Sequence, residues 1–166
     1  YDPTSGSASL LLTVGQSVAK HNGNPDSVKY YAQELIKETY NLTRMNLIMR
    51  GIKPANIVTK NADTLIDDWP LQENEVDPLR VDACCSNPPY SKEWVVPTAS
   101  DPRFDEYGRA PKSKADYAFL LHNLYHLNAG GIMTIVLPHG VLFRGGEESK
   151  ICTKLLENGN IEAIIG

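Results

Sequence analysis

The sequence is poor in three features that mark large classes of proteins. Its apolar runs fall far short of the roughly 20 residues that a helix needs to cross a bilayer. It has only three cysteines, Cys84, Cys85 and Cys152, and an odd number with an adjacent pair is not a secreted disulfide framework. Without a Cys-x-x-Cys or a matching His spacing, we predict no metal site. We favour buried thiols in a reducing cytoplasm, with no membrane partner.

Excess positive charge is also missing, because 20 acidic residues outweigh 16 Lys and Arg and leave a net charge of -4. Proteins that hold nucleic acid through its phosphates usually carry a basic surface. If this chain acts on DNA, most of the binding must come from elsewhere in a longer protein or from a partner. One locally basic run, 109–114, is compatible with phosphate contact and equally with a solvated loop.

The pattern that is present predicts a single α/β domain. Segments with helical periodicity alternate with strand-like segments, which indicates a mostly parallel sheet with helices on both faces. The predicted helices are 9–20, 37–49, 115–127, closed by Gly130-Gly131, and 147–156. The predicted strands are 28–32, 56–59, 81–85, 132–137 and 161–166.

Both ends of the sequence suggest a piece of a longer protein. The chain opens on Tyr1-Asp2-Pro3, which has the pattern of a strand end, without Met or a basic and apolar leader. Residues 161–166 have the pattern of a strand with nothing after it. We therefore expect residues 1–166 to be one domain truncated at both ends.

One long segment, 91–114, departs from the alternation of helices and strands. We predict a loop here on the strength of its turn-forming residues, Pro97, Pro102, Gly108 and Pro111, which lie among many charges. A loop of this length inside a compact domain is uncommon and often functional.

The turn 2–9 is the first group of candidate binding residues. Its small residues let the backbone approach a ligand closely, and the helix that follows offers free N–H groups. Glu34 closes the next strand, where an acidic residue holds ribose hydroxyls in nucleotide-binding α/β folds. The turn lacks the Gly-x-Gly-x-x-Gly spacing and the P-loop Lys, so it does not favour NAD or ATP. An ordinary strand–turn–helix junction is the alternative.

The second group is Asn87-Pro88-Pro89-Tyr90, directly after a small apolar strand. The prolines fix the backbone, so the Pro88 carbonyl has a rigid direction beside the Asn87 amide oxygen. Two acceptors next to an aromatic ring suit a planar amine whose lone pair is delocalised, since holding its hydrogens favours the pyramidal form during methyl transfer. A proline-rich turn with an exposed tyrosine is the alternative.

These motifs resemble those of the amino-methyltransferases. Two further segments, Lys-Ala-Asp-Tyr-Ala-Phe at 114–119 and Val-Leu-Pro-His-Gly-Val-Leu-Phe-Arg at 136–144, make the chain similar to the modification subunit of type I restriction–modification systems. The resemblance implies a class I S-adenosylmethionine-dependent methyltransferase fold, a Rossmann-like three-layer sandwich. It also implies that 1–166 is a truncated catalytic methyltransferase core. The implied reaction is N6-adenine methylation of duplex DNA, with a specificity subunit and a restriction subunit as partners.

The resemblance also implies a role for each motif residue. The target amine would be held by Asn87 and the Pro88 carbonyl, with Pro89 fixing the turn and Tyr90 stacking on the flipped-out base. Glu34 would hold the cofactor ribose, and Asp63 would meet its adenine amino group. The methionine part of the cofactor would be lined by Asp2, Ser5, Gly6 and Ser7. In that turn, Ser7-Ala8 stands where many relatives have a second glycine.

Other interpretations stay open at this point. Asp63 could be a solvated carboxylate or a cap, and we interpret Asp116 as a helix N-cap. We interpret His139 as a loop residue, and Trp69 and Trp94 as packing or loop anchors. The Asn-Pro-Pro-Tyr motif would equally suit N5 methylation of a protein glutamine. A non-catalytic scaffold with the same fold is a third possibility.

Overall fold

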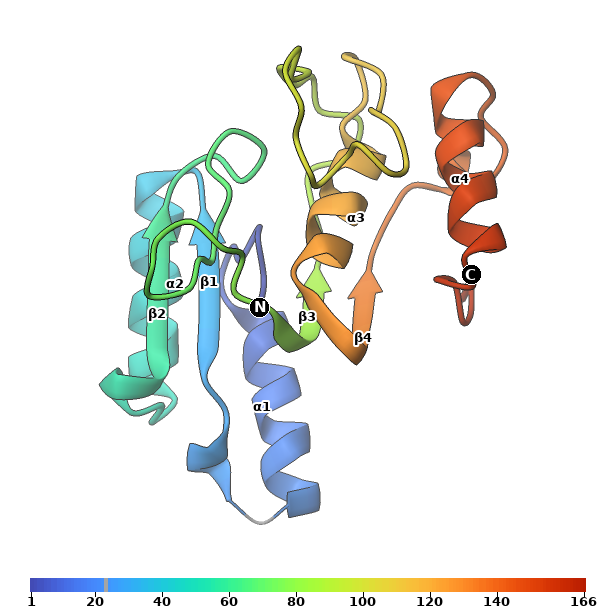
Figure 1. Cartoon of the computed structure of the whole chain (residues 1–166). Coiled ribbons are helices and arrows are strands. Elements are labelled where there is room, and N and C mark those ends of the chain that lie inside the picture. Colours follow the sequence, from blue (N-terminus) through green and yellow to red (C-terminus); the bar gives the residue numbers. More distant parts are fainter. Residues whose placement is uncertain (23) are drawn as a thin grey trace.

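Parallel strands form the centre of the molecule (Figure 1). The computed structural model describes residues 1–22 and 24–166. In it, β1 (Tyr30–Glu34) pairs in parallel with β2 (Ile57–Asn61). In the same way β3 (Val81–Ser86) pairs in parallel with β4 (Leu127–Ile135).

The first two residues join these two pairs of strands. Asp2 donates its backbone N–H to Tyr31 O at 3.0 Å on β1. Tyr1 donates to Ala83 O at 2.8 Å and accepts from Cys85 N at 3.0 Å, both on β3. The resulting order is β2, β1, residues 1–2, β3 and β4. This order confirms the expected mostly parallel sheet and gives the strand-like character of Tyr1-Asp2 a place in it.

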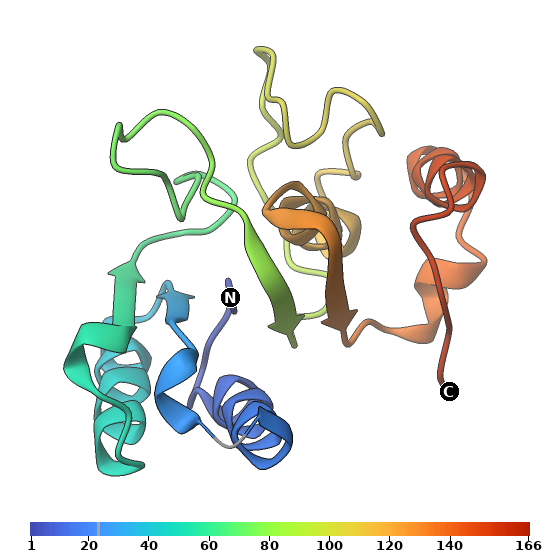
Figure 2. The ribbon, with the colours of Figure 1, turned by 60° about the horizontal axis from the view of Figure 1, so that its bottom comes forward.

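Helices cover both faces of these strands (Figure 2). In that view α1 and α2 lie on one side and α3 lies on the other. The helices are α1 (Ser9–Asn22), α2 (Lys37–Met49), α3 (Asp116–Tyr125) and α4 (Glu147–Glu157), with 3-10 turns η1 (Pro25–Ser27), η2 (Pro54–Asn56) and η3 (His139–Leu142). None of the helices in 1–22 and 24–166 combines the length and apolar character that a membrane crossing requires.

The adjacent cysteines show how β3 packs on both sides. Cys84 contacts Asn123 O of α3 at 3.6 Å, whereas Cys85 packs with Leu11 of α1. Successive side chains of a strand point to opposite faces, so the pair cannot share one environment. Burial raises the pKa of the Cys84 thiol to about 11 and that of Cys85 to about 12. Both are therefore neutral core thiols, as the sequence predicts.

The segment 91–114 is a loop, as predicted, but it is a packed one. Trp94 and Phe104 are buried, with ring centroids 5.4 Å apart. The two ends of the loop are tied together, because Trp94 N donates to Lys112 O at 3.0 Å and Ala115 N donates to Lys92 O at 2.9 Å. The loop therefore has its own small core, and Trp94 is the packing anchor that the sequence suggests.

The prediction that Gly130-Gly131 closes the third helix was wrong. The helix ends at Tyr125, and β4 begins at Leu127 and runs through both glycines. The register of β3 and β4 shifts here, and a Cβ at Gly131 would lie 3.0 Å from Asp82 O. The glycines therefore form a bulge where the backbones of two strands come close.

The prediction of a closing strand at 161–166 was also wrong. These residues have no regular secondary structure, and Ile164 and Ile165 are exposed. A strand exists only where a neighbour supplies hydrogen-bond partners. In the described part of the chain, 161–166 make no such ladder with β4.

Candidate functional site

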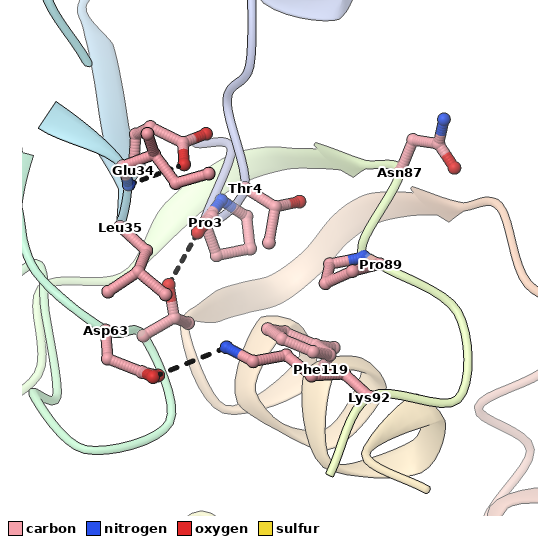
Figure 3. A pocket seen from close by; sticks show the side chains of 11 residues that line it. Pro3, Thr4, Glu34, Leu35, Asp63, Asn87, Pro89, Lys92 and Phe119 are labelled. Carbon is pink, nitrogen blue, oxygen red and sulfur yellow. Dashed lines mark hydrogen bonds and ion pairs between the residues drawn. The ribbon is translucent and has the colours of Figure 1, made fainter. Parts of the chain in front are cut away.

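A cavity of about 430 Å³ opens beyond the carboxyl ends of the strands (Figure 3). Ligands of open α/β sheets bind at this edge, and the volume lies within the range of roughly 300–1,000 Å³ typical of small-molecule sites. Its wall combines residues from segments far apart in sequence: Pro3, Thr4, Glu34, Leu35, Ile36, Asp63, Thr64, Asn87, Pro89, Lys92 and Phe119. The lining thus brings together the first turn, the end of β1, the segment after β2 and the segment after β3.

Glu34 is fixed at the mouth of this cavity by two backbone donors. Gly6 N donates to Glu34 Oε2 at 3.0 Å, and Ile36 N donates to Glu34 Oε1 at 3.0 Å. Gly6 has φ of +54°, a left-handed conformation that glycine adopts at little cost. Each carboxylate oxygen keeps a further lone pair, so Glu34 can still accept hydrogen bonds from a ligand hydroxyl.

The other residues of the first turn lie behind or beside the cavity wall. Asp2 is buried and accepts from Thr4 N at 2.9 Å. Burial raises the pKa of the Asp2 carboxyl to about 7, and the Thr4 hydrogen bonds oppose the rise. Ser5 is buried, with Oγ 3.0 Å from Thr43 Oγ1, while Ser7 is exposed and its carbonyl accepts from Asn46 Nδ2 at 2.9 Å. Thr43 and Asn46 belong to α2, so these bonds fix the turn to that helix. Ser5 N also donates to Gln33 O, which fixes the turn to β1.

Asp63 has one oxygen in a local turn and the other in the cavity. Its Oδ1 accepts from Leu65 N at 3.0 Å, within a turn that begins no helix. Its Oδ2 lies 3.4 Å from Lys92 Nζ, and Figure 3 shows Lys92 reaching across toward it. Next to it, Thr64 Oγ1 donates to Pro3 O at 2.5 Å. This bond ties the segment after β2 to the first turn.

The Asn87-Pro88-Pro89-Tyr90 turn follows β3 on the opposite wall. Asn87 and Pro89 line the cavity, and Asn87 is exposed, while Pro88 is buried. Tyr90 has 52% of its surface exposed, and its hydroxyl donates to Asn87 Oδ1 at 3.1 Å. The ring is therefore available for stacking, and its hydroxyl occupies one of the acceptor positions of the Asn87 amide.

The interpretation of Asp116 as an N-cap was wrong. Ala115 occupies the cap position of α3, and Asp116 is the first helical residue. Its carboxylate instead accepts from Ser91 N at 2.8 Å and from Arg144 Nη1 at 2.7 Å. These partners are 25 and 28 residues away, so no local pattern could indicate them.

The structure brings most of the predicted binding residues to one place. Glu34, Asp63, Asn87 and Pro89 line the cavity directly. Asp2, Ser5, Gly6 and Ser7 belong to the turn whose Pro3 and Thr4 line it, and Pro88 and Tyr90 flank the two lining residues of their turn. The sequence did not indicate four other lining residues, Leu35, Ile36, Lys92 and Phe119. Phe119 belongs to the 114–119 segment that carries part of the family resemblance, which was the available signal.

A second polar cluster, apart from the cavity lining, is formed by Asp68 with His122 and His126 at the end of α3. Both nitrogens of His126 face oxygens, Leu79 O at 2.9 Å and Asp68 Oδ1 at 2.9 Å. His122 Nδ1 lies 3.3 Å from the Arg103 guanidinium. A cation next to ring nitrogens that are already engaged opposes metal binding. We interpret this cluster as a buried hydrogen-bond network of the core.

Comparison with known proteins identifies the family and the fold. A family model described as N-6 DNA Methylase matches residues 1–166. A methyltransferase subunit of a type I restriction–modification system from Streptococcus thermophilus superposes with a TM-score of 0.84 at 50% identity, over 96% of this chain and 33% of that one. A class I S-adenosylmethionine-dependent methyltransferase structure from Listeria monocytogenes has a TM-score of 0.62 at 20% identity, over 94% of this chain and 43% of that one, and supports the fold alone.

Relatives known by sequence have similar descriptions. The methylase subunit of the type I restriction enzyme MpnII from Mycoplasma pneumoniae is 41% identical over 99% of this chain and 31% of its own length. The corresponding HindI subunit from Haemophilus influenzae is 34% identical over 84% of this chain and 30% of its own length. The chain thus spans just under a third of each of these relatives.

Proposed function

The chain belongs to the N-6 DNA methylase family, and from this premise we propose that it is the catalytic core of an S-adenosylmethionine-dependent DNA adenine-N6 methyltransferase. The observation that carries the proposal is the cavity at the strand ends. It places Glu34 and Asp63 on one wall and the Asn87-Pro88-Pro89-Tyr90 turn on another. A cofactor and an amine held at these two walls would lie next to each other, which is the requirement for direct transfer.

The donor set on the first wall fits the cofactor. The Glu34 carboxylate, fixed by Gly6 N and Ile36 N, would accept both ribose hydroxyls. Asp63 Oδ2 would accept from the adenine amino group, in exchange for or beside Lys92. The exposed Leu35 and Ile36 offer an apolar surface for a ring at the same wall. When bound, S-adenosylmethionine supplies an activated methyl group on a sulfonium.

The residues of the second wall would prepare the target amine. Asn87 Oδ1 and the Pro88 carbonyl would accept its two hydrogens, so that the lone pair turns toward the methyl donor. Asn87 Oδ1 accepts from the Tyr90 hydroxyl in this structure, so the amine would replace that contact or share the oxygen. The exposed Tyr90 ring would stack on a base rotated out of the duplex.

The wider assignment concerns the protein to which this domain would belong. Relatives described as type I methylase subunits support DNA as the substrate over a protein glutamine. The net charge of -4 argues that this domain supplies little of the phosphate binding. We therefore assign most of the DNA binding to other parts of the full-length protein and to a specificity subunit. A restriction subunit would be a further partner.

Replacing Asn87 with alanine in the full-length protein, assembled with its partners, tests the second wall. We expect kcat for adenine methylation of duplex DNA to fall on the order of 100-fold or more, because one transition-state acceptor is lost. The affinity for S-adenosylmethionine, measured by calorimetry, should change little. Asn128→Ala is the matched control. Asn128 donates to Asp82 Oδ1 at the start of β3, far from the carboxyl ends of the strands where the cavity lies. Unchanged methylation by Asn87→Ala would contradict the proposal.

Two substitutions of Tyr90 separate its ring from its hydroxyl. Tyr90→Ala should weaken productive DNA binding by about 1–3 kcal/mol, the usual value of stacking one base on an aromatic ring. Tyr90→Phe keeps the ring and removes the bond to Asn87, so it should retain most of the activity. The readout is kcat/KM for a duplex with one target adenine. Equal losses in the two variants would contradict a stacking role.

A further inference from the structure

An ion pair that does not line the cavity joins two of the sequence segments that carry the family resemblance. Asp116 belongs to the segment 114–119 and Arg144 ends the segment 136–144. Arg144 Nη1 donates to Asp116 Oδ2 at 2.7 Å, and the Asp116 side chain is fully buried. Such a carboxylate is costly to bury unless all its oxygens are bonded. We therefore expect the Asp116 carboxylate to fix the positions of the groups that are bonded to it.

The other oxygen of Asp116 holds the backbone immediately after the Asn-Pro-Pro-Tyr turn. Ser91 N donates to Asp116 Oδ1 at 2.8 Å, and the next carbonyl, Lys92 O, accepts from Ala115 N at 2.9 Å. Ser91 has φ of +51°, in the left-handed region that side chains other than glycine adopt at a cost. Strained residues persist where their surroundings fix them. Here the bonds of Ser91 N to Asp116 and of Ala115 N to Lys92 O fix the backbone around Ser91.

We infer that Asp116, held by Arg144, is a positioning residue that sets the geometry of the Asn87–Tyr90 turn through Ser91. The inference rests on the proposed function for its catalytic consequence, because a turn displaced by about 1 Å would misplace both amine acceptors. Asp116 itself faces Ser91 and Arg144 and does not line the cavity.

Gly140 and Glu148 complete the arrangement around Arg144. Arg144 Nη1 also donates to Glu148 Oε1 at 3.0 Å, so one guanidinium joins a carboxylate from α3 and one from α4. A Cβ at Gly140 would lie 2.6 Å from Arg144 Nε. Both contacts are made by Nη1, so a guanidinium moved by a Cβ at Gly140 would weaken both of them. The glycine of the 136–144 segment therefore makes room for its arginine.

The test uses the full-length methyltransferase with its partners and compares three variants. Asp116→Ala removes both contacts, and we expect kcat for DNA methylation to fall on the order of 100-fold with little change in S-adenosylmethionine affinity. Asp116→Asn keeps an oxygen for Ser91 N and should recover part of the loss. Gly140→Ala displaces Arg144 without touching Asp116, so it should give a smaller decrease of the same kind.

Tyr117→Phe is the control for stability alone. It removes another buried hydrogen bond of α3, from Tyr117 Oη to Val141 O at 2.8 Å, but has no contact with Ser91. We expect it to lower the melting temperature while kcat stays near the wild-type value. A kcat of Asp116→Ala no lower than that of Tyr117→Phe would overturn the inference.

Hydrogen exchange supplies a readout that does not depend on activity. In the Asp116 and Gly140 variants, the peptide spanning 86–95 should lose protection, while the turn 2–9 keeps its own. If the wild-type protein methylates no DNA, the proposed function fails, yet this exchange pattern still decides the positioning role. Unchanged protection of 86–95 in Gly140→Ala and in a folded Asp116 variant would overturn it.

Discussion

At the scale of single residues, Asp2 combines a buried carboxyl group with a place in the turn of the proposed cofactor site. Its carboxyl is buried at the centre of the sheet, and burial raises its pKa from 3.8 to about 7. A raised carboxyl pKa means that the folded chain holds the proton more tightly than the unfolded chain does. The contribution to stability is therefore greatest below pH 3.8 and is lost as the pH rises to about 7. The proposed cofactor site would account for a carboxyl group at a position where its charged form is costly.

The variant Asp2→Asn tests this combination. At pH 8 we expect it to be more stable than the wild type, by at most about 4 kcal/mol, because each tenfold change in proton affinity corresponds to roughly 1.4 kcal/mol. An amide keeps the Thr4 contact without a charge. The gain should vanish toward pH 4, and affinity for S-adenosylmethionine should fall. Urea unfolding at both pH values and calorimetry are the measurements. Asp82→Asn, at an exposed position of β3, is the control. A gain of equal size at pH 4 would argue against charge burial as its cause.

The sequence predicts candidate residues best where chemistry follows a strand end. Glu34, Asp63 and Asn87 each lie at or just after the end of a strand, so parallel strands alone bring them to one edge. The contacts of Asp116 and Lys92 depend instead on the path of the loop 91–114, which contains Lys92 and ends just before Asp116. No periodicity encodes that path, which explains why Asp116 was mistaken for a cap and Lys92 was missed.

At the scale of elements, the loop 91–114 behaves as part of the core. Phe104 is fully buried within it, and Arg103 donates to Thr64 O at 3.0 Å and Leu65 O at 3.1 Å. The loop thus connects the segment after β2 to the turn after β3. Its composition predicts the lack of helix and strand, but turn-forming residues do not indicate whether a loop is packed.

Truncating Phe104 to alanine tests the packing of this loop. We expect a loss of about 3–5 kcal/mol in the free energy of unfolding, the usual cost of removing a buried phenylalanine. Cleavage within 91–114 by a nonspecific protease should become faster for the same reason. Val95→Ala, at a side chain 73% exposed, should cost less than about 0.5 kcal/mol. Similar losses in the two variants would contradict a loop core.

The wrong helix end at Gly130-Gly131 and the wrong closing strand have a common physical cause. Gly130-Gly131 is a frequent helix terminator, yet here the pair permits close contact with β3. The segment 161–166 has strand-like composition but no ladder partner in the described residues. Both outcomes are decided by what lies beside the segment, which sequence periodicity does not contain.

At the scale of the whole molecule, one buried network joins distant segments. His122 of α3 lies 2.9 Å from the Tyr1 hydroxyl and 3.3 Å from Arg103 Nη1. A guanidinium only donates, so we assign the proton of His122 to Nε2, which donates to Tyr1. The Tyr1 hydroxyl in turn donates to Gln33 Oε1 or to the Trp69 carbonyl. The sheet, α3 and the loop therefore share one set of hydrogen bonds.

This network makes the stability of the molecule sensitive to acid. Burial, with the neighbouring His126 and Arg103 charges, holds the pKa of His122 well below its ordinary 6.5. As the pH falls below 6.5, the unfolded chain takes up a proton that the folded chain refuses. His122 should thus contribute a loss of stability of up to about 1.4 kcal/mol for each pH step of one. That loss should be absent at pH 7.5.

The variant His122→Gln separates this effect from simple packing. Glutamine keeps a donor and an acceptor but does not titrate, so the variant should be less stable at pH 7.5 yet lose less stability between pH 6.5 and 5.5. His139→Gln, which replaces an exposed histidine, is the matched control. The measurement is the free energy of urea unfolding at the three pH values. If wild type and His122→Gln lose stability in parallel on acidification, another group must be responsible, and the network would only hold the segments together.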